Sequence, residues 1–196
     1  VTNAGANVMG YPTDNAGNPT STTLQALQLP TTAPIGAQQT TSMTAEFNLD
    51  ARAPVWNAVT PNTPLTTYGT SLTTYDAQGV AIPTSFYLQK TGNDTWNMFT
   101  DPTSAATAVT SSVGTLTFGT NGLLTSAGTA ALNVTSPNPA IGTFPVTVDL
   151  SSVTQYGASF GVSNLTQDGY APGELTGLKI GEDGVITARY SNGVTQ

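Results

Sequence analysis

The sequence predicts an all-β fold made of two β-rich domains, the second inserted into the first. Short stretches that alternate between apolar and polar residues recur along the chain, and Gly, Pro and Asn separate them. Good helix formers are sparse, whereas Thr, Val, Gly and Asn are common. Two proline-rich connections bracket a self-contained set of strands. We therefore expect an outer discontinuous domain from residues 1–48 and 147–196, and an inserted domain over residues 49–146.

The first 50 residues predict two turns and two strands. The turns fall at residues 10–12 and 14–19, where Gly, Asn and Asp tolerate positive φ and Pro fixes φ. A short strand is expected through Leu24, Leu27 and Leu29, ended by Pro30. A clearer strand has Met43, Ala45, Phe47 and Leu49 at period two.

A meander is predicted after the first connection, Asp50 to Leu65, which carries three prolines. Its strands are TSLTTYD, VAIPTSFYLQK and TWNMFT, with turns at Gln78-Gly79 and at residues 92–94. Pro83 cannot donate to a strand ladder, so we expect it at an edge or a bulge.

Two hairpins follow the meander. Asn121-Gly122 predicts a tight turn within GTLTFGTNGLLTSAG. The stretch SPNPAIGTFPV, with three prolines, is expected to be the second connection. The last hairpin is expected to run from Leu175 to Ile180, turn at residues 181–184, and return from Val185 to Tyr190.

Composition and charge exclude several classes of function. The 196 residues contain no Cys and no His, which removes disulfides, Cys/His zinc sites and His-based triads. Four basic residues against eleven acidic ones make nucleic acid and anionic membranes unsuitable partners. No apolar run approaches the roughly 20 residues of a membrane span, and we expect no secretory signal peptide in VTNAGANVMGYP.

Carboxylates are the remaining candidates for catalysis. A glycosidase would need two of them about 5 to 10 Å apart, and the candidates are Glu46, Glu174 and Glu182. Glu182 sits in a Glu-Asp-Gly turn, where a solvated carboxylate has no burial to raise its pKa. Two tryptophans, Trp56 and Trp96, are few for a sugar-binding cleft. We therefore expect no catalytic residues.

We also expect no metal-binding or cofactor-binding residues, and no cofactor. Asp168-Gly169 and Glu182-Asp183-Gly184 offer oxygen ligands, but neither has the spacing of an EF-hand loop, and both are interpreted as turns. No glycine-rich phosphate-binding motif is present.

The aromatic residues of the meander are interpreted as core and cross-strand packing, with a subunit contact as the functional alternative. Because neighbours in a strand point to opposite faces, at least one of Phe86 and Tyr87 should face away from the core. The residues concerned are Tyr68, Tyr75, Phe86, Tyr87, Trp96 and Phe99.

Several motifs together resemble those of bacterial flagellar hook proteins. The stretch NLTQDGYAPGELTGLKIGEDGVITARYSNG is similar to the C-terminal part of that family, with Asp168, Gly169, Tyr170 and Glu174 in its first half and Ile180, Asp183, Gly184 and Tyr190 to Gly193 in its second. The segment TSLTTYDAQGVAIPTSFYLQKTGNDTWNMFTD and the short VMGYP also resemble the family. The resemblance covers nearly the whole chain.

The resemblance implies a structural subunit of the hook, the flexible tube that transmits torque from rod and motor to filament. It implies export through the flagellar channel, an extracellular place in the hook and basal body, and an inserted two-domain architecture. Its implied partners are copies of itself in a helical tube, and the hook cap, rod and hook-associated proteins. The family's helical N- and C-terminal segments are not in this sequence, so we expect a core fragment that is monomeric.

Two alternatives stay open. One is another flagellar axial protein, of the distal rod or hook-associated kind, although a distal-rod protein is expected to lack the meander at residues 66–125. The other is an extracellular carbohydrate-binding or adhesin β-module, which would need an exposed aromatic cluster or a calcium site.

Overall fold

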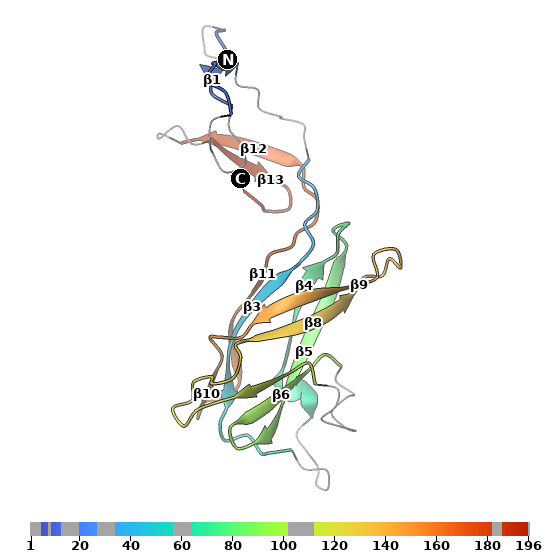
Figure 1. Cartoon of the computed structure of the whole chain (residues 1–196), viewed down its shortest axis with the longest axis vertical. Helices are drawn as coiled ribbons and strands as arrows, with labels where there is room; N and C mark the ends of the chain where they lie inside the picture. Colours follow the sequence, from blue (N-terminus) through green and yellow to red (C-terminus); the bar gives the residue numbers. More distant parts are fainter. Residues whose placement is uncertain are drawn as a thin grey trace.

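The structure is a computed structural model that describes residues 5–7, 9–12, 20–26, 34–56, 64–101, 112–181 and 186–195. These residues form β-strands and one short 3-10 helix, η1 (Leu65–Tyr68), so the predicted all-β class is confirmed. Two sheets make an elongated body, and a thin connection of two chain segments leads from it to a small hairpin (Figure 1). No helix in this described part is long and apolar enough to cross a membrane.

The first sheet of the body is the predicted meander extended by one strand. It runs in the order β4-β5-β6-β7, and all neighbours are antiparallel. Its members are β4 (Gly69–Tyr75), β5 (Ala81–Gly92), β6 (Thr95–Phe99) and β7 (Gly114–Thr117). Tyr68, expected on a strand, lies in η1 instead.

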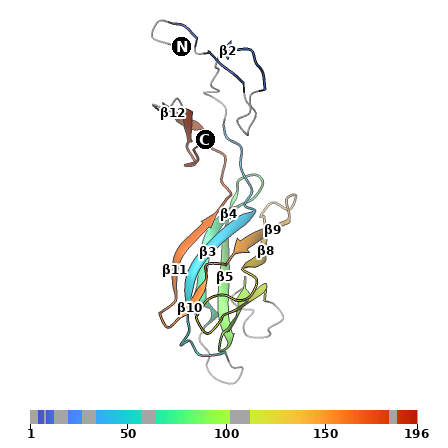
Figure 2. The same ribbon diagram turned by 60° about the vertical axis from the view of Figure 1, so that its left-hand side comes forward.

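The second sheet is assembled from segments far apart in the sequence. Strand β3 lies in its middle, antiparallel to β11 on one side and parallel to β9 and β10 on the other, and β8 pairs with β9. The strands are β3 (Ser42–Asp50), β8 (Thr129–Thr135), β9 (Thr143–Asp149), β10 (Thr154–Tyr156) and β11 (Gly161–Gln167). Figure 2 shows this sheet against the meander.

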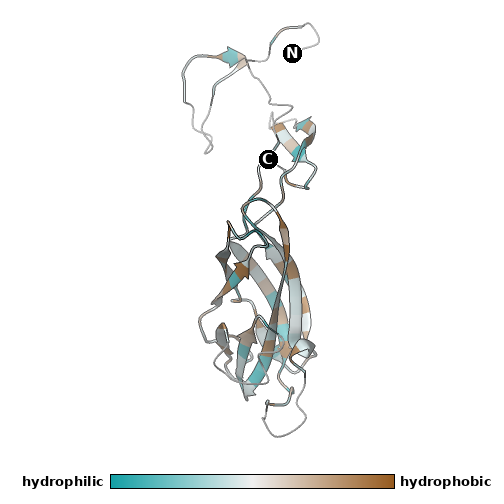
Figure 3. Cartoon of the chain, turned by 90° about the vertical axis from the view of Figure 1, so that its right-hand side faces the viewer, coloured by the Kyte–Doolittle hydropathy of each residue, from teal (hydrophilic) through white to brown (hydrophobic). Residues whose placement is uncertain are grey.

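The core lies between the two sheets. Alternate residues of β3, β8 and β9 are buried, as the period of a strand requires, and polar and apolar residues alternate along the body in Figure 3. Trp96 is fully buried, and its ring packs edge-on against that of Tyr68, with 5.1 Å between the ring centroids. Phe86 is buried and Tyr87 is partly exposed, which confirms the expectation for this pair.

The stretch SPNPAIGTFPV is not simply a connection. Residues 136–142 form the turn between β8 and β9, but Phe144, Pro145 and Val146 belong to β9. Proline in a stretch of this kind predicts a connection, yet Pro145 lies within β9, where it pairs only with Asn133 of β8, and β3 joins β9 from Thr147 onward. Pro83 is similar, because β6 joins β5 only from Tyr87 onward, so it has a neighbour strand on one side.

The expected domain boundaries fall inside strands. The boundary at 48/49 lies within β3 and the boundary at 146/147 lies within β9, and these two strands pair with each other. Residues 42–50 and 143–167 therefore share the core of the meander. The division of the chain into two domains stays a prediction.

Beyond the body lie two small pairs of strands. Strand β12 (Leu175–Ile180) pairs with β13 (Ile186–Tyr190), as the sequence predicts for the last hairpin. Strand β1 (Met9–Gly10) pairs with β2 (Gln25–Ala26), within the short strand expected there. The rest of that strand, Leu27 to Pro30, and turn residues 182–184 lie outside the described residues.

Candidate functional site: the neck and the end hairpin

The structure keeps the two candidate catalytic carboxylates that it describes, Glu46 and Glu174, apart. Glu46 lies on β3 in the body, whereas Glu174 is exposed at the far end of the connection, directly before β12 (Figure 1). Glu182 and Asp183 lie outside the described residues. Within the described ranges, no group of three or more His, Cys, Asp or Glu side chains could hold a metal ion.

Two chain segments, residues 34–41 and 168–174, join the body to the hairpin, and we call them the neck. They run antiparallel and exchange paired backbone hydrogen bonds at two places. Ile35 and Gly173 donate to each other's carbonyls at 2.8 and 3.1 Å, and Gln38 and Tyr170 do so at 2.9 and 3.0 Å. The neck is thus a narrow two-stranded ribbon and not a pair of independent linkers.

The ribbon has a mismatch where it enters the body. Met43 pairs with Gln167, and the next pair is Gln38 with Tyr170, so one segment advances five residues while the other advances three. The surplus falls at Thr40 and Thr41. Thr40 bonds instead with Tyr75 at the end of β4, and the Thr41 carbonyl accepts the amide N–H of Thr147 of β9.

The Asp168 carboxylate fills this mismatch. It accepts hydrogen bonds from the backbone N–H groups of Thr41 and Ser42, at 2.8 and 3.0 Å, and from their hydroxyls, at 2.6 and 3.1 Å. Partial burial opposes ionisation, but these four hydrogen bonds outweigh it and lower the pKa of Asp168 to about 2. Asp168 is therefore a charged clamp between the two neck segments at neutral pH.

The residues on either side of Asp168 complete the junction. The Gln167 side-chain oxygen accepts hydrogen bonds from the Gly169 amide at 2.6 Å and from the Thr40 hydroxyl at 2.8 Å. A Cβ at Gly169 would lie 2.7 Å from the Thr40 nitrogen, so only glycine allows this approach. Asp168-Gly169, expected to be a turn, lies instead where the chain bends from β11 into the neck without reversing.

The turn between β4 and β5 supports the middle of the neck. Gly79 has φ +78° and lies so close that a Cβ there would be 2.6 Å from Pro172 Cδ and 2.8 Å from Ala37 Cβ. Buried Asp76 shapes the turn by accepting the N–H groups of Gln78 and Val80. The same turn is fixed to the β8–β9 turn, because the Ser136 hydroxyl donates to Asp76 at 2.6 Å and the Asn138 amide donates to Gln78 at 3.0 Å. The hydrogen bond from Ser136, above all, lowers the pKa of Asp76.

The end hairpin is tied to the other end of the neck. The Asn192 side-chain amide donates to the Ala171 carbonyl at 2.6 Å, and the Ser191 hydroxyl accepts the Glu174 N–H at 2.9 Å. A Cβ at Gly173 would lie 2.6 Å from the Asn192 side chain. Ser191 and Asn192 thus hold the hairpin against the neck segment that leads into it.

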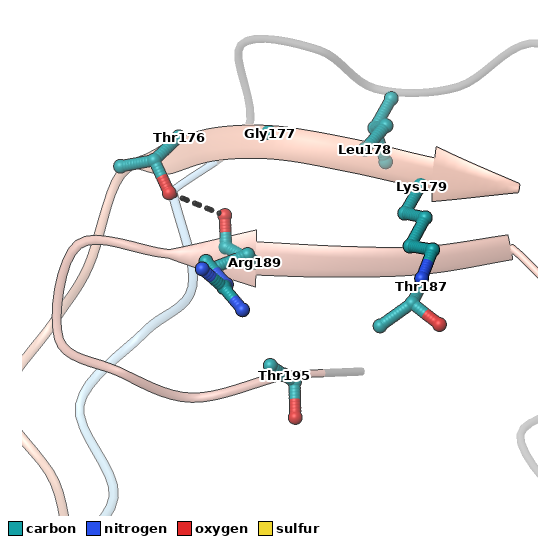
Figure 4. A pocket seen from close by; sticks show the side chains of 7 residues that line it. All are labelled: Thr176, Gly177, Leu178, Lys179, Thr187, Arg189 and Thr195. Atoms are coloured by element: carbon teal, nitrogen blue, oxygen red, sulfur yellow. Dashed lines mark hydrogen bonds between the residues drawn. The ribbon is translucent and has the colours of Figure 1, made fainter.

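One face of the hairpin carries a shallow, open hollow of about 400 Å³ (Figure 4). Gly177 lies opposite Arg189, and a Cβ at Gly177 would meet no atom within 4 Å. Lys179 lies opposite Thr187 on the same face. The chain's other two basic residues are held in the body, since Arg52 pairs with Asp50 and buried Lys90 donates to the Ala51 carbonyl. The residues around the hollow are Thr176, Gly177, Leu178, Lys179, Thr187, Arg189 and Thr195.

The comparison with known families decides the identity. Residues 47–170 match the family model described as the flagellar basal body protein FlaE D2 domain. The chain belongs to this family. The match begins within β3, covers β4 to β11 and ends at Tyr170, the residue that pairs with Gln38 in the neck.

Relatives of this chain are flagellar hook proteins, the family that its motifs resemble. The predicted resemblance is therefore confirmed. The flagellar hook protein FlgE of Escherichia coli K12 is 31% identical over 98% of this chain, and that of Salmonella typhimurium LT2 is 32% identical over 96%. These matches cover 49% and 48% of the two relatives, so the chain spans about half of their length.

A solved structure shows the same fold. The crystal structure of the Helicobacter pylori flagellar hook protein FlgE2 aligns with a TM-score of 0.61 at 13% sequence identity. The alignment covers 100% of this chain and 76% of that one.

The motifs that carry the resemblance meet at the neck. Asp76 and Gly79 of YDAQG, Asp168 and Gly169 of LTQDGY, and Asn192 of YSNG contact the two neck segments or the turns that support them. Sequence reasoning found these residues but interpreted them as separate turns. It missed Thr40 and Thr41, because single threonines in a Thr-rich stretch give no signal of a junction.

Proposed function

We propose that this chain is the central part of a structural subunit of the bacterial flagellar hook, the flexible tube that transmits torque from rod and motor to filament. The observation that carries the proposal is the similarity to flagellar hook proteins over 98% of the chain, at 31% identity. The family match over residues 47–170 supports it independently. The chain acts by shape and contact and not by catalysis.

In this proposal the subunit works in the hook, outside the cell, after export through the flagellar channel. It packs against copies of itself in a helical tube, and the hook cap, rod and hook-associated proteins meet the ends of that tube. The regions of the full-length protein outside this chain drive polymerisation, so the chain alone is monomeric.

A bending tube requires neighbouring subunits to change their spacing as it rotates. Exposed strand faces suited to this carry hydroxyl and amide groups that water can bridge at several spacings with similar energy. Strand β11, an edge strand with the sequence GVSNLTQ, is exposed along most of its length and has no charged side chain. Weak polar contacts of this kind are what we expect between subunits.

The test compares this chain with the full-length protein that contains it, by light scattering after size-exclusion chromatography and by electron microscopy. We expect a monomer from the chain and tubes from the full-length protein. Full-length protein that forms no tube, or a stable dimer of the chain with a large apolar interface, would contradict the proposal.

A further inference from the structure

We propose that the neck is a locked joint that holds the end hairpin at one orientation relative to the body, with Asp168 and the Asp76–Val80 turn as the positioning elements. The proposal concerns the geometry of this chain and holds whether or not the chain is a hook subunit. Two extended segments in solvent would by themselves give a flexible connection, because few contacts would restrict them. The contacts at the neck restrict both bending and sliding.

Sliding of one neck segment past the other is opposed by Asp168. Its carboxylate is on one segment and its four donors, from Thr41 and Ser42, are on the other. A shift of one residue would remove the two backbone donors from the carboxylate. Thr40, fully buried, is meanwhile bonded to Tyr75 of β4, which fixes the same segment to the body.

Bending of the neck towards the β4–β5 turn is opposed by contact. Gly79 packs against Ala37 on one segment and Ala171 and Pro172 on the other, so the turn touches both. The turn cannot move aside freely, because Asp76 and Gln78 bond to Ser136 and Asn138 of the neighbouring turn. The lock therefore consists of a clamp at the junction and a support halfway along the neck.

The joint can be tested by measuring the distance between the body and the hairpin. The chain has no cysteine, so spin labels can be placed at two introduced cysteines, Thr129→Cys on β8 and Thr187→Cys on β13, both exposed. Pulsed electron spin resonance then gives the distribution of distances across the neck. A second pair, Thr129→Cys with Ser71→Cys on β4, reports on the body alone.

We expect one narrow distribution in the otherwise unchanged chain. Asp168→Ala should make it about twofold wider, because the clamp is lost. Gly79→Ala should shift its mean, because the added methyl displaces Pro172 and Ala37. Should Asp168→Ala fail to fold, Thr41→Val with Ser42→Ala removes the two hydroxyl donors and should widen the distribution less.

Gly122→Ala is the matched control. Gly122 has φ +76°, and a Cβ there would lie 2.6 Å from the Gln155 carbonyl oxygen and 2.7 Å from the Tyr156 ring, so backbone strain and crowding resemble those at Gly79. Its neighbours belong to β10 and not to the neck. It should lower thermal stability as Gly79→Ala does, yet leave the body-to-hairpin distance unchanged.

A distribution that is already broad in the unchanged chain would overturn the proposal. If only one of Asp168→Ala and Gly79→Ala leaves the body-to-hairpin distance distribution unchanged, and the labels within the body also report no change, the contact altered in that variant does not help to fix the neck. Unchanged distributions in both Asp168→Ala and Gly79→Ala would overturn the lock as a whole.

Discussion

At the scale of single residues, Asp168 shows how a side chain can substitute for a sheet ladder. Regular sheet pairing stops where four residues on one segment, 39–42, face two on the other, 168–169, and the backbone N–H groups of Thr41 and Ser42 are left without ladder partners. Unpaired backbone groups are costly, and the carboxylate satisfies both. The ionised Asp168 carboxylate thus stabilises the folded junction between the body and the neck.

The first prediction concerns the acid stability of this clamp. A folded pKa of about 2, below the ordinary 3.8, means that ionised Asp168 stabilises the fold above about pH 4 and that this stabilisation is lost as the pH falls towards 2. Because the group is partly solvated, we expect it to be worth about 1 kcal/mol. Urea unfolding from pH 2 to 7 should show it as the difference between the unchanged chain and Asp168→Asn.

Asp50, Asp76 and Asp149 also have lowered pKa values, so the unchanged chain and the Asp168→Asn variant both lose stability in acid. The comparison with Asp168→Asn cancels this shared loss. A difference that does not depend on pH would contradict the assignment of a charged clamp.

A second prediction concerns Lys90, a cation that is only 6% exposed. Its ammonium donates to the Ala51 carbonyl, while its backbone carbonyl accepts the Trp56 N–H. Removing a buried charge and filling its volume is often neutral or stabilising, whereas truncation leaves a cavity. We expect Lys90→Met to change the free energy of unfolding by less than about 1 kcal/mol and Lys90→Ala to cost about 2 kcal/mol. Equal losses in both variants would show that the ammonium itself is needed.

At the scale of elements, strand β9 shows where tertiary pairing overrides a local signal. Strand β8 pairs with β9 along residues 143–149, whereas β3 pairs only with residues 147–149. Pro145 therefore has a neighbouring strand on one side only. Val146 and Val148, the next inward residues, are fully buried between the sheets. Pro145 thus lies just outside the stretch where β3 pairs with β9, and it does not mark the end of strand β9.

A third prediction tests this element. Val146→Ala should lower the free energy of unfolding by about 2 kcal/mol, because it removes buried methyl groups from the core. Thr147→Ala, the neighbour on the exposed face, should cost less than about 0.5 kcal/mol. Similar losses from both substitutions in guanidinium unfolding would show that β9 does not alternate between core and solvent.

At the scale of the whole molecule, the body and the end hairpin differ in how they are held together. The body encloses a hydrophobic core whose members all lie between Met43 and Val153. The hairpin has one strand pair and depends on Ser191 and Asn192 for its contact with the neck. We propose that the boundary between the body and the outer domain lies at the neck, near residues 41 and 168. It does not lie at residues 48 and 146.

A fourth prediction follows from this revised boundary. A shortened chain of residues 34–174 keeps the whole core and both neck segments. We expect it to unfold cooperatively with a midpoint within a few degrees of the full chain. A chain of residues 49–146, the inserted domain predicted from the sequence, lacks most of β3, the end of β9, and all of β10 and β11, and should not fold. Calorimetry distinguishes the two, and a stable 49–146 fragment would restore the original boundary.

The sequence by itself determined the fold class, the meander, the last hairpin and the family. These features are local: strand periodicity, Asn-Gly and Gly turns, and short motifs each lie within about 30 residues. The residues that support the neck were also visible in those motifs. Their purpose was not visible, because each contact joins partners far apart in the chain, such as Asp168 with Thr41 and Asp76 with Ser136.

Only the tertiary structure decided which strands share a sheet, where the body ends and what the motif residues do. Strand β3 lies between β11 and β9, which come about 100 residues later in the chain, and no local pattern encodes that choice. The choice follows from burial, since the apolar faces of β3, β8 and β9 can leave water only against the meander. The register mismatch, and hence the role of Asp168, is a consequence of that packing.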